Sequence, residues 1–411
     1  WTVLDKLAFV VLVALILAYN GNDNLCHYAI VNTYLRGNIP PCSLNDPNTP
    51  LLYHSLFDAA ASLFADGLGL VPETALDVVT IVCVFACIAS LQAISRMLFC
   101  GRWTQQVARL FFVAGFGPVY LTALWGSSVQ DMAVFFRGQT TQSFAESIFR
   151  RPMGLNYVLF LFLLAAVLPR LSSRRGRAHS SRAIHAGFLL PSVYLVPQAS
   201  EELVALAAVL AVWLWLSGKL PLRWLAVWSG LALASLSMSP VILGMLFGGS
   251  AVPVPELALA WPPTLPRWDE MYDRDGLPLL SKAALLPFAV EWGPLFLGGL
   301  MFSATESRRR VLAAVFLLGL AVACSFRLNQ WIKADMDRFL FYGTCAGFML
   351  SATWIEILES ARRRNSLPPL FSRVVGLVFI ILPTTLGPAG YAARHIVQGF
   401  AGGLEKPRVE V

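Results

Sequence analysis

Long apolar runs, each close to the length that crosses a bilayer, are the feature that most limits how this chain can fold. A helix needs about 20 apolar residues to span the hydrocarbon core of a membrane. Eleven such runs occur along the sequence, so we expect residues 1–411 to form one all-α, polytopic transmembrane domain. The runs are Val3–Tyr19, Thr74–Phe99, Gln106–Trp125, Met153–Leu168, Ile184–Val196, Leu203–Leu216, Trp224–Phe247, Ala284–Thr305, Val311–Phe326, Phe339–Leu358 and Leu370–Ala393.

The composition supports the membrane class. Of the 411 residues, 57% are hydrophobic and 13% are charged, whereas soluble domains average about 25% charged residues. In such a chain the net charge of +7 marks cytoplasmic loops rather than a nucleic-acid partner. Residues Thr2–Tyr19 carry Asp5 and Lys6 near their start, and no small-residue cleavage site precedes Asn20, so we expect a genuine first span rather than a cleaved signal.

Basic residues occupy every second connection between the apolar runs. Cytoplasmic loops are enriched in Lys and Arg, so this alternation predicts a cytoplasmic N-terminus and an extracytoplasmic C-terminus. An error of one span in the count would break the alternation. The basic residues are Arg96, Arg102 and Arg109, then Arg170, Arg174, Arg175, Arg177 and Arg182, then Lys219 and Arg223, then Arg308, Arg309 and Arg310, and finally Arg362, Arg363 and Arg364.

The remaining connections are longer and hold almost all the acidic residues. Three of them are the predicted outward loops at residues 20–72, 248–283 and 327–338. Ionisable groups at membrane depth are costly unless they are paired, hydrated or functional, so a polar set on one face predicts a site. The set is Asp23, His27, His54, Asp58, Asp131, Arg137, Glu201, Glu202, Asp269, Glu270, Asp335, Asp337 and Arg338.

The first outward loop places an acid, two imidazoles and a phenol at the rim of the membrane. Asp23 and His27 are four residues apart, so they share one face if this piece is helical. Tyr53 and His54 open the apolar stretch Leu51–Leu70, which polar residues interrupt, so we expect an interfacial helix there. Asp23 can act as a general base or hold a divalent metal such as Mg²⁺ or Mn²⁺. The alternative is that it only caps the following helix.

The last outward loop offers a second candidate. Asp337 and Arg338 stand at the start of the tenth apolar run, and Arg327 adds a cation on the same loop. Arginine can hold a phosphate through two parallel hydrogen bonds. An interfacial ion pair with acids at a helix start is the alternative. The sequence contains no Walker loop, GxGxxG, HExxH or GxSxG motif, which argues against nucleotide hydrolysis and the common hydrolase sites.

The first loop resembles the first extracytoplasmic loop of bacterial polytopic glycosyltransferase-like proteins of the GT-C fold. The likeness covers Asp23 and His27, the turn Arg36-Gly37-Asn38-Ile39-Pro40-Pro41, and Tyr53-His54 with Asp58 further on. The late Asp337-Arg338 pair is similar as well. The resemblance implies a bacterial inner-membrane enzyme that takes a sugar from a polyprenyl-phosphate donor and passes it to an acceptor outside. It also implies that Asp23 is the base or metal ligand, although Asn22 and Asn24 stand where the family often has a second acid.

These roles define a predicted mechanism and a predicted site. Asp23 would deprotonate an acceptor hydroxyl, and Arg338, helped by Arg327, would bind the leaving phosphate, with inversion at the sugar carbon. His27, Tyr53, His54 and Asp337 are further predicted substrate-binding residues. We expect Asp23, His54 and Arg338 to line one cavity. Membrane lipids and the polyprenyl-phosphate sugar are the expected partners.

Two cysteines of the first loop are predicted to pair. Cys26 and Cys42 lie in the same outward loop, in an oxidising compartment if the membrane is a bacterial inner membrane. A disulfide that closes a loop of about 15 residues contributes roughly 3 kcal/mol in the chain-entropy model.

Two other functional classes remain open at this point. A non-catalytic subunit of a larger membrane complex would keep the fold without the chemistry. A transporter would explain the two short runs Ile184–Val196 and Leu203–Leu216, which can be half-length helices.

Overall fold

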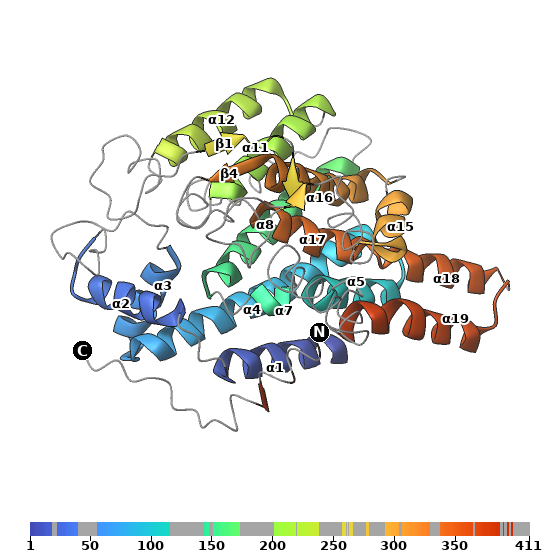
Figure 1. Ribbon diagram of the computed structural model, residues 1–411, viewed down its shortest axis with the longest axis horizontal. Coiled ribbons are helices and arrows are strands. Elements are labelled where there is room, and N and C mark those ends of the chain that lie inside the picture. Colours follow the sequence, from blue (N-terminus) through green and yellow to red (C-terminus); the bar gives the residue numbers. More distant parts are fainter. Residues whose placement is uncertain are drawn as a thin grey trace. The chain divides into compact units, whose positions relative to one another are not determined.

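Helices make up most of the part of the chain that the structure describes (Figure 1). In this computed structural model the described residues are 1–18, 23–39, 56–115, 144–147, 151–172, 201–218, 220–237, 257–259, 261, 263–265, 277–278, 292–303, 306–328, 338–364, 366–386, 389, 393 and 396–397. The helices are α1 (Val3–Ala18), α2 (Asp23–Leu35), α3 (Leu56–Leu68), α4 (Pro72–Leu98), α5 (Arg102–Ala114), α7 (Phe144–Ser147), α8 (Arg151–Ser172), α11 (Glu201–Leu216), α12 (Leu222–Ser237), α15 (Pro294–Ser303), α16 (Ser307–Ser325), α17 (Arg338–Leu350), α18 (Thr353–Arg363), α19 (Pro369–Val375) and the π-helical η5 (Gly376–Ile381).

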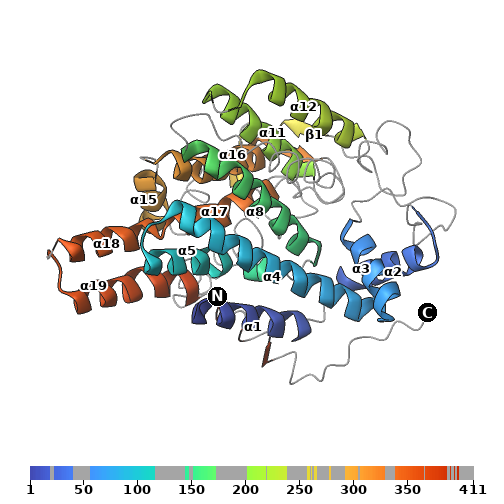
Figure 2. The same ribbon diagram turned by 180° about the vertical axis from the view of Figure 1, so that it is seen from behind.

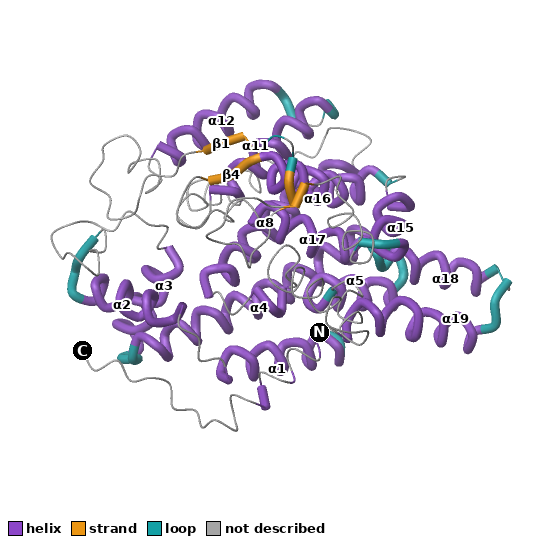
Figure 3. The backbone as a smooth tube through the Cα atoms, viewed as in Figure 1, coloured by secondary structure: helices purple, strands orange, loops and turns teal. Residues whose placement is uncertain are grey.

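Short strands accompany the helices, where the sequence predicted an all-α chain (Figure 3). Strand β1 (Leu257–Leu259) pairs antiparallel with β4 (Phe326–Leu328), and β2 (Thr264–Leu265) pairs with β3 (Leu277–Pro278). These strands are two or three residues long and lie in two of the predicted outward loops. A segment this short cannot show the alternation of apolar and polar residues that marks a strand, so only the pairing identifies it.

Two described helices are long and apolar enough to cross a membrane, Pro72–Leu98 and Pro369–Leu386. Shorter apolar helices lie at Met153–Pro169 and Leu206–Leu216. The predicted eleven spans are therefore not confirmed. A helix of 16 residues, such as α1, is about 24 Å long, which is less than the roughly 30 Å of a hydrocarbon core.

The predicted tenth span, Phe339–Leu358, is not one continuous helix. It consists of α17 and α18, which are separated by a turn at Ser351 and Ala352. Helix α18 and the segment formed by α19 and η5 then run side by side in both ribbon views (Figures 1 and 2). The apolar run alone did not show this break because serine and alanine interrupt hydropathy very little.

The chain divides into two compact units. The first comprises Trp1–Ala8, Leu91–Ser147 and Glu256–Arg394, and the second comprises Phe9–Ser90, Ile148–Pro255 and His395–Val411. The single domain predicted for residues 1–411 is thus built from two clusters of contacts, each made of segments that are distant in sequence.

Glycines on α17 allow the core of the first unit to pack closely. A Cβ atom at Gly343 would lie 2.7 Å from the Cα atom of Phe316, so the backbones of α17 and α16 touch at this point. One turn later, Gly347 leaves room for the ring of Phe296, which packs edge-on against Phe316 and Phe348. The Gly343-x-x-x-Gly347 spacing is the small-residue pattern that brings apolar helices together in membranes.

The second unit is formed around α2, α3 and α8, with α11 and α12 packed beyond α8. Helix α3 places Phe57, Asp58, Ala61, Ser62 and Ala65 on its buried side. Four of these five residues are small or apolar, as expected for the buried stripe of an amphipathic helix. Asp58 is the exception, and it leads to the candidate site.

Candidate functional site

A buried hydrogen bond between two titratable side chains joins the two helices of the predicted first outward loop. Nδ1 of His27 on α2 lies 2.8 Å from Oδ1 of Asp58 on α3. The side chain of Asp58 is fully buried, and that of His27 is 12% exposed. The ring of His27 also packs edge-on against Phe57, with 6.2 Å between ring centroids. The imidazole is therefore held by a carboxylate and by an aromatic ring.

The electrostatics of this pair are those of a carboxylate removed from water. Burial raises the pKa of the Asp58 carboxyl above its usual range, while the hydrogen bond and the charge of His27 act in the opposite direction. Its second oxygen, Oδ2, is buried and has no hydrogen-bond partner among the described residues. A buried carboxylate is costly unless a polar partner or a proton accompanies it, and His27 is the side-chain partner described for Asp58.

The arrangement leaves one ring nitrogen available for chemistry. Because Asp58 occupies Nδ1 of His27, Nε2 is the nitrogen that can accept or donate a proton elsewhere. A carboxylate behind Nδ1 fixes the tautomer and supports the protonated ring, which is the arrangement that general bases and metal-binding histidines share. Among the described residues no three His, Cys, Asp or Glu side chains come together to hold a metal ion.

The other predicted residues of the first loop are only partly described. Asp23 is the first residue of α2, and its side chain lies outside the described part, as do Tyr53 and His54 entirely. Cys26 is an exposed free thiol, and Cys42 lies outside the described residues. Because Cys42 is not described, the predicted disulfide stays a prediction.

The residues of the last loop are described through their backbones alone. Arg327 lies in β4, where it pairs with Ala258 of β1, and Arg338 is the first residue of α17. Asp337 lies outside the described residues. Asp23 and Arg338 belong to different compact units, so their predicted common cavity with His54 stays a prediction.

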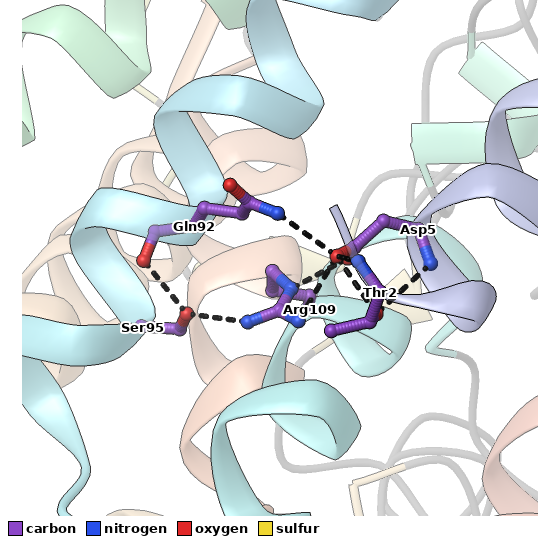
Figure 4. Close-up of polar contacts among 5 residues, drawn as sticks. All are labelled: Thr2, Asp5, Gln92, Ser95 and Arg109. Carbon is purple, nitrogen blue, oxygen red and sulfur yellow. Dashed lines mark hydrogen bonds and ion pairs between the residues drawn. The ribbon is translucent and has the colours of Figure 1, made fainter. Parts of the chain in front are cut away.

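A second polar cluster lies at the start of α1, in the first unit (Figure 4). Asp5 accepts hydrogen bonds from Nε and Nη2 of Arg109 at 2.7 and 3.2 Å, and from Nε2 of Gln92 at 3.0 Å. Nη1 of Arg109 donates to Oγ of Ser95 at 3.1 Å. The residues Asp5 and Arg109 are 5% and 7% exposed. The pair thus ties α1 to α4 and α5.

Thr2 and Asp5 also cap α1 reciprocally. The backbone N–H of Thr2 donates to Asp5 Oδ2 at 2.8 Å, and the backbone N–H of Asp5 lies 3.3 Å from Thr2 Oγ1. This is a capping box, which satisfies N–H groups that the first turn of a helix leaves free. One carboxylate therefore serves both the helix start and the ion pair.

A third cluster uses the basic residues in the first turn of α16. Nη1 of Arg308 donates to the carbonyl of Met97, and Nε of Arg309 donates to the carbonyl of Leu98 at 3.0 Å, so both cap the C-terminus of α4. Arg309 also pairs with Glu356 of α18 at 2.6 Å, and its guanidinium lies 4.5 Å from the centroid of the Phe99 ring. At 3% exposed, Arg309 is a buried structural residue rather than a free loop charge.

All three clusters join segments that the sequence assigns to the same side of the membrane. His27 and Asp58 both belong to the first outward loop, whereas Asp5, Arg109 and Arg309 belong to the N-terminus and the basic connections. None of these three pairs links an outward loop to a basic connection.

Comparison with protein-family models, curated proteins and solved structures found no match to this chain. The candidate site therefore rests on its own residues. Sequence reasoning singled out His27 but did not assign a role to Asp58. The signal was present, because Asp58 falls on the apolar side of the amphipathic stretch Leu51–Leu70, where an acid needs a partner.

Proposed function

We propose that the chain is an integral membrane glycosyltransferase of the GT-C type, which uses a polyprenyl-phosphate sugar on the extracytoplasmic side. The observation that carries the proposal is the buried His27–Asp58 pair, which fastens α2 to α3. Helix α2 begins at Asp23, so the pair braces the segment that presents the predicted catalytic carboxylate. Buried ionisable groups at the rim of a membrane are more often functional than incidental.

The reaction follows from the residue types. Asp23 takes the proton of an acceptor hydroxyl, and the oxygen of that hydroxyl forms a bond to the anomeric carbon of the sugar. The bond from that carbon to the phosphate oxygen breaks, and the polyprenyl phosphate leaves with the electron pair. Arg338, helped by Arg327, binds the departing phosphate, since a guanidinium matches two phosphate oxygens at once. In-line displacement inverts the configuration at the sugar carbon.

The orientation in the membrane is part of the same proposal. A bacterial inner membrane, with the N-terminus in the cytoplasm, puts residues 20–72, 248–283 and 327–338 outside. The separation of polar contacts into an outward set and a basic set supports this arrangement. The two helices long enough to span a membrane, Pro72–Leu98 and Pro369–Leu386, are in accord with it.

A direct assay tests the enzyme. Membranes that contain the full chain are incubated with short-chain polyprenyl-phosphate hexoses and pentoses, radiolabelled in the sugar, and release of label from the lipid is measured. We expect release with at least one donor, and a loss of roughly 100-fold or more in Asp23→Asn, the usual scale for a general base. Asp66→Asn is the matched control, because Asp66 is exposed on the neighbouring helix α3. Unchanged release in Asp23→Asn would remove its catalytic role.

A non-catalytic subunit of a membrane complex is the second candidate. Two observations favour it. Asn22 and Asn24 flank Asp23, so a paired acid is missing. The segment Pro369–Leu386 has only 28% of its apolar window buried, which leaves a surface for lipid or a partner helix. Absence of transfer with every donor, together with co-purification of a stoichiometric membrane partner after mild solubilisation, would favour this candidate.

A further inference from the structure

The His27–Asp58 pair has more than a bracing role in the proposed reaction. We propose that the imidazole of His27 receives from Asp23 the proton of the acceptor hydroxyl, and that Asp58 is the positioning residue that holds the ring for this step. The inference rests on the proposed glycosyl transfer and names a second group that handles protons in α2. It concerns described side chains, whereas the side chain of Asp23 is not described.

The geometry of the pair is that of a supported base. The 2.8 Å contact between Nδ1 and Oδ1 is a charge-assisted hydrogen-bond distance, and the edge-on contact with Phe57 limits rotation of the ring. With Nδ1 in use, Nε2 is the only nitrogen of His27 left to accept a proton. The small exposed fraction of His27, against none for Asp58, makes the imidazole the accessible member of the pair.

Charge explains why the carboxylate lies behind the ring. Proton uptake converts a neutral imidazole into a cation, which is unfavourable in a poorly hydrated place unless an anion lies beside it. Asp58 supplies that anion at hydrogen-bond distance, and its buried Oδ2 has no described partner that would compete with His27 for the charge. The proton acceptor is thus prepared before the substrate arrives, which is how enzymes lower the barrier to charge development.

The proposed step balances. The acceptor O–H bond breaks, its proton passes by way of the Asp23 carboxylate to Nε2 of His27, and its electron pair forms the new bond to the sugar carbon. The sugar–phosphate bond breaks, and polyprenyl phosphate carries away that electron pair. Asp23 lies one helical turn before His27 in α2, so the first and second proton acceptors belong to the same face of one helix. The imidazolium releases its proton to water after the product leaves.

Kinetics of three variants test the assignment in full-length protein with the polyprenyl-phosphate sugar panel described above. We expect His27→Ala to lower kcat by roughly 100-fold or more, because proton transfer contributes 10² to 10⁴ in rate. Asp58→Asn should lower kcat by about tenfold or more. In both variants KM for the donor should stay within about threefold of the wild-type value. Added imidazole should restore part of the rate of His27→Ala but not that of Asp58→Asn. The matched control Asp66→Asn should keep the full rate. Full activity of His27→Ala, or a rate loss that imidazole does not repair, would overturn the assignment.

A spectroscopic measurement tests the pair without activity. The chain has five histidines, so protein labelled with ¹⁵N at histidine gives few imidazole signals in detergent micelles. The signals that disappear in His27→Ala identify its ring. We expect those ¹⁵N shifts to change in Asp58→Asn and to stay in place in Asp66→Asn. Unchanged shifts in Asp58→Asn would refute the pair itself, whereas changed shifts with no transferase activity in the wild-type protein would refute the proposed function alone.

Discussion

Removal of either member of the Asp5–Arg109 pair should destabilise the protein strongly. Both residues are almost fully buried, and Arg109 makes three hydrogen bonds to Asp5 and Ser95. Loss of one partner from a buried ion pair costs about 3–5 kcal/mol, because the remaining charge is left uncompensated. The two single variants should nevertheless differ in the cost that they show.

The hydrogen bonds of each partner decide which variant is worse. In Arg109→Ala, the Asp5 carboxylate keeps donors from Gln92 and Thr2 at 2.8–3.0 Å, so we expect a cost near 3 kcal/mol. In Asp5→Ala, Arg109 keeps only Ser95 among its described partners, and the capping box of α1 is lost too, so we expect a cost near 5 kcal/mol.

The assay is unfolding by SDS in mixed micelles, followed by the fluorescence of the twelve tryptophans. The double variant Asp5→Ala/Arg109→Ala should cost no more than Asp5→Ala alone, because it removes both charges and their coupling of roughly 3 kcal/mol. Arg102→Ala, an exposed arginine on the same helix α5, should change the unfolding free energy by less than about 0.5 kcal/mol. Single-variant costs under about 1 kcal/mol, or costs that simply add in the double variant, would refute the reasoning.

Further predictions concern the other two clusters and the topology. Because burial raises the pKa of Asp58, folded protein binds its proton more readily than unfolded protein, so this residue's contribution to stability falls as pH rises above the unfolded value of about 3.9. Melting temperatures from pH 4 to 8 should therefore decline less steeply in Asp58→Asn than in the wild-type protein. Arg309→Ala should lower the unfolding free energy by about 2–3 kcal/mol, less than the Arg109 value because its partner Glu356 is 25% exposed. Arg309→Lys should recover less than half, since an ammonium cannot reach the Leu98 carbonyl and Glu356 together. Single cysteines placed at Asn45 and Glu306 should react with a membrane-impermeant reagent from opposite sides, and labelling from one side would contradict the proposed orientation.

The spacing of apolar residues and the polar or proline-containing segments between the apolar runs were enough to locate most of the described helices. The apolar runs at Val3–Tyr19 and Thr74–Phe99 became α1 and α4 within a few residues at each end. The interrupted stretch Leu51–Leu70 contains α3, because a regular apolar stripe on one side of a helix is a local property of the chain. The length of each helix was less predictable, because a run of apolar residues does not reveal a turn such as the one between α17 and α18.

The hydrogen-bond and ion-pair partners of the buried polar residues, by contrast, were decided by tertiary structure alone. The sequence singles out His27 by its place in a polar loop, but a carboxylate 31 residues later becomes its partner only when α2 packs on α3. Arg109 and Arg309 read as ordinary loop charges, and only the approach of α1 and of the end of α4 makes them buried structural groups. The physical reason is that hydropathy is a property of each residue by itself. The stability of a buried charge instead depends on a second residue, which can be a hundred positions away in the sequence.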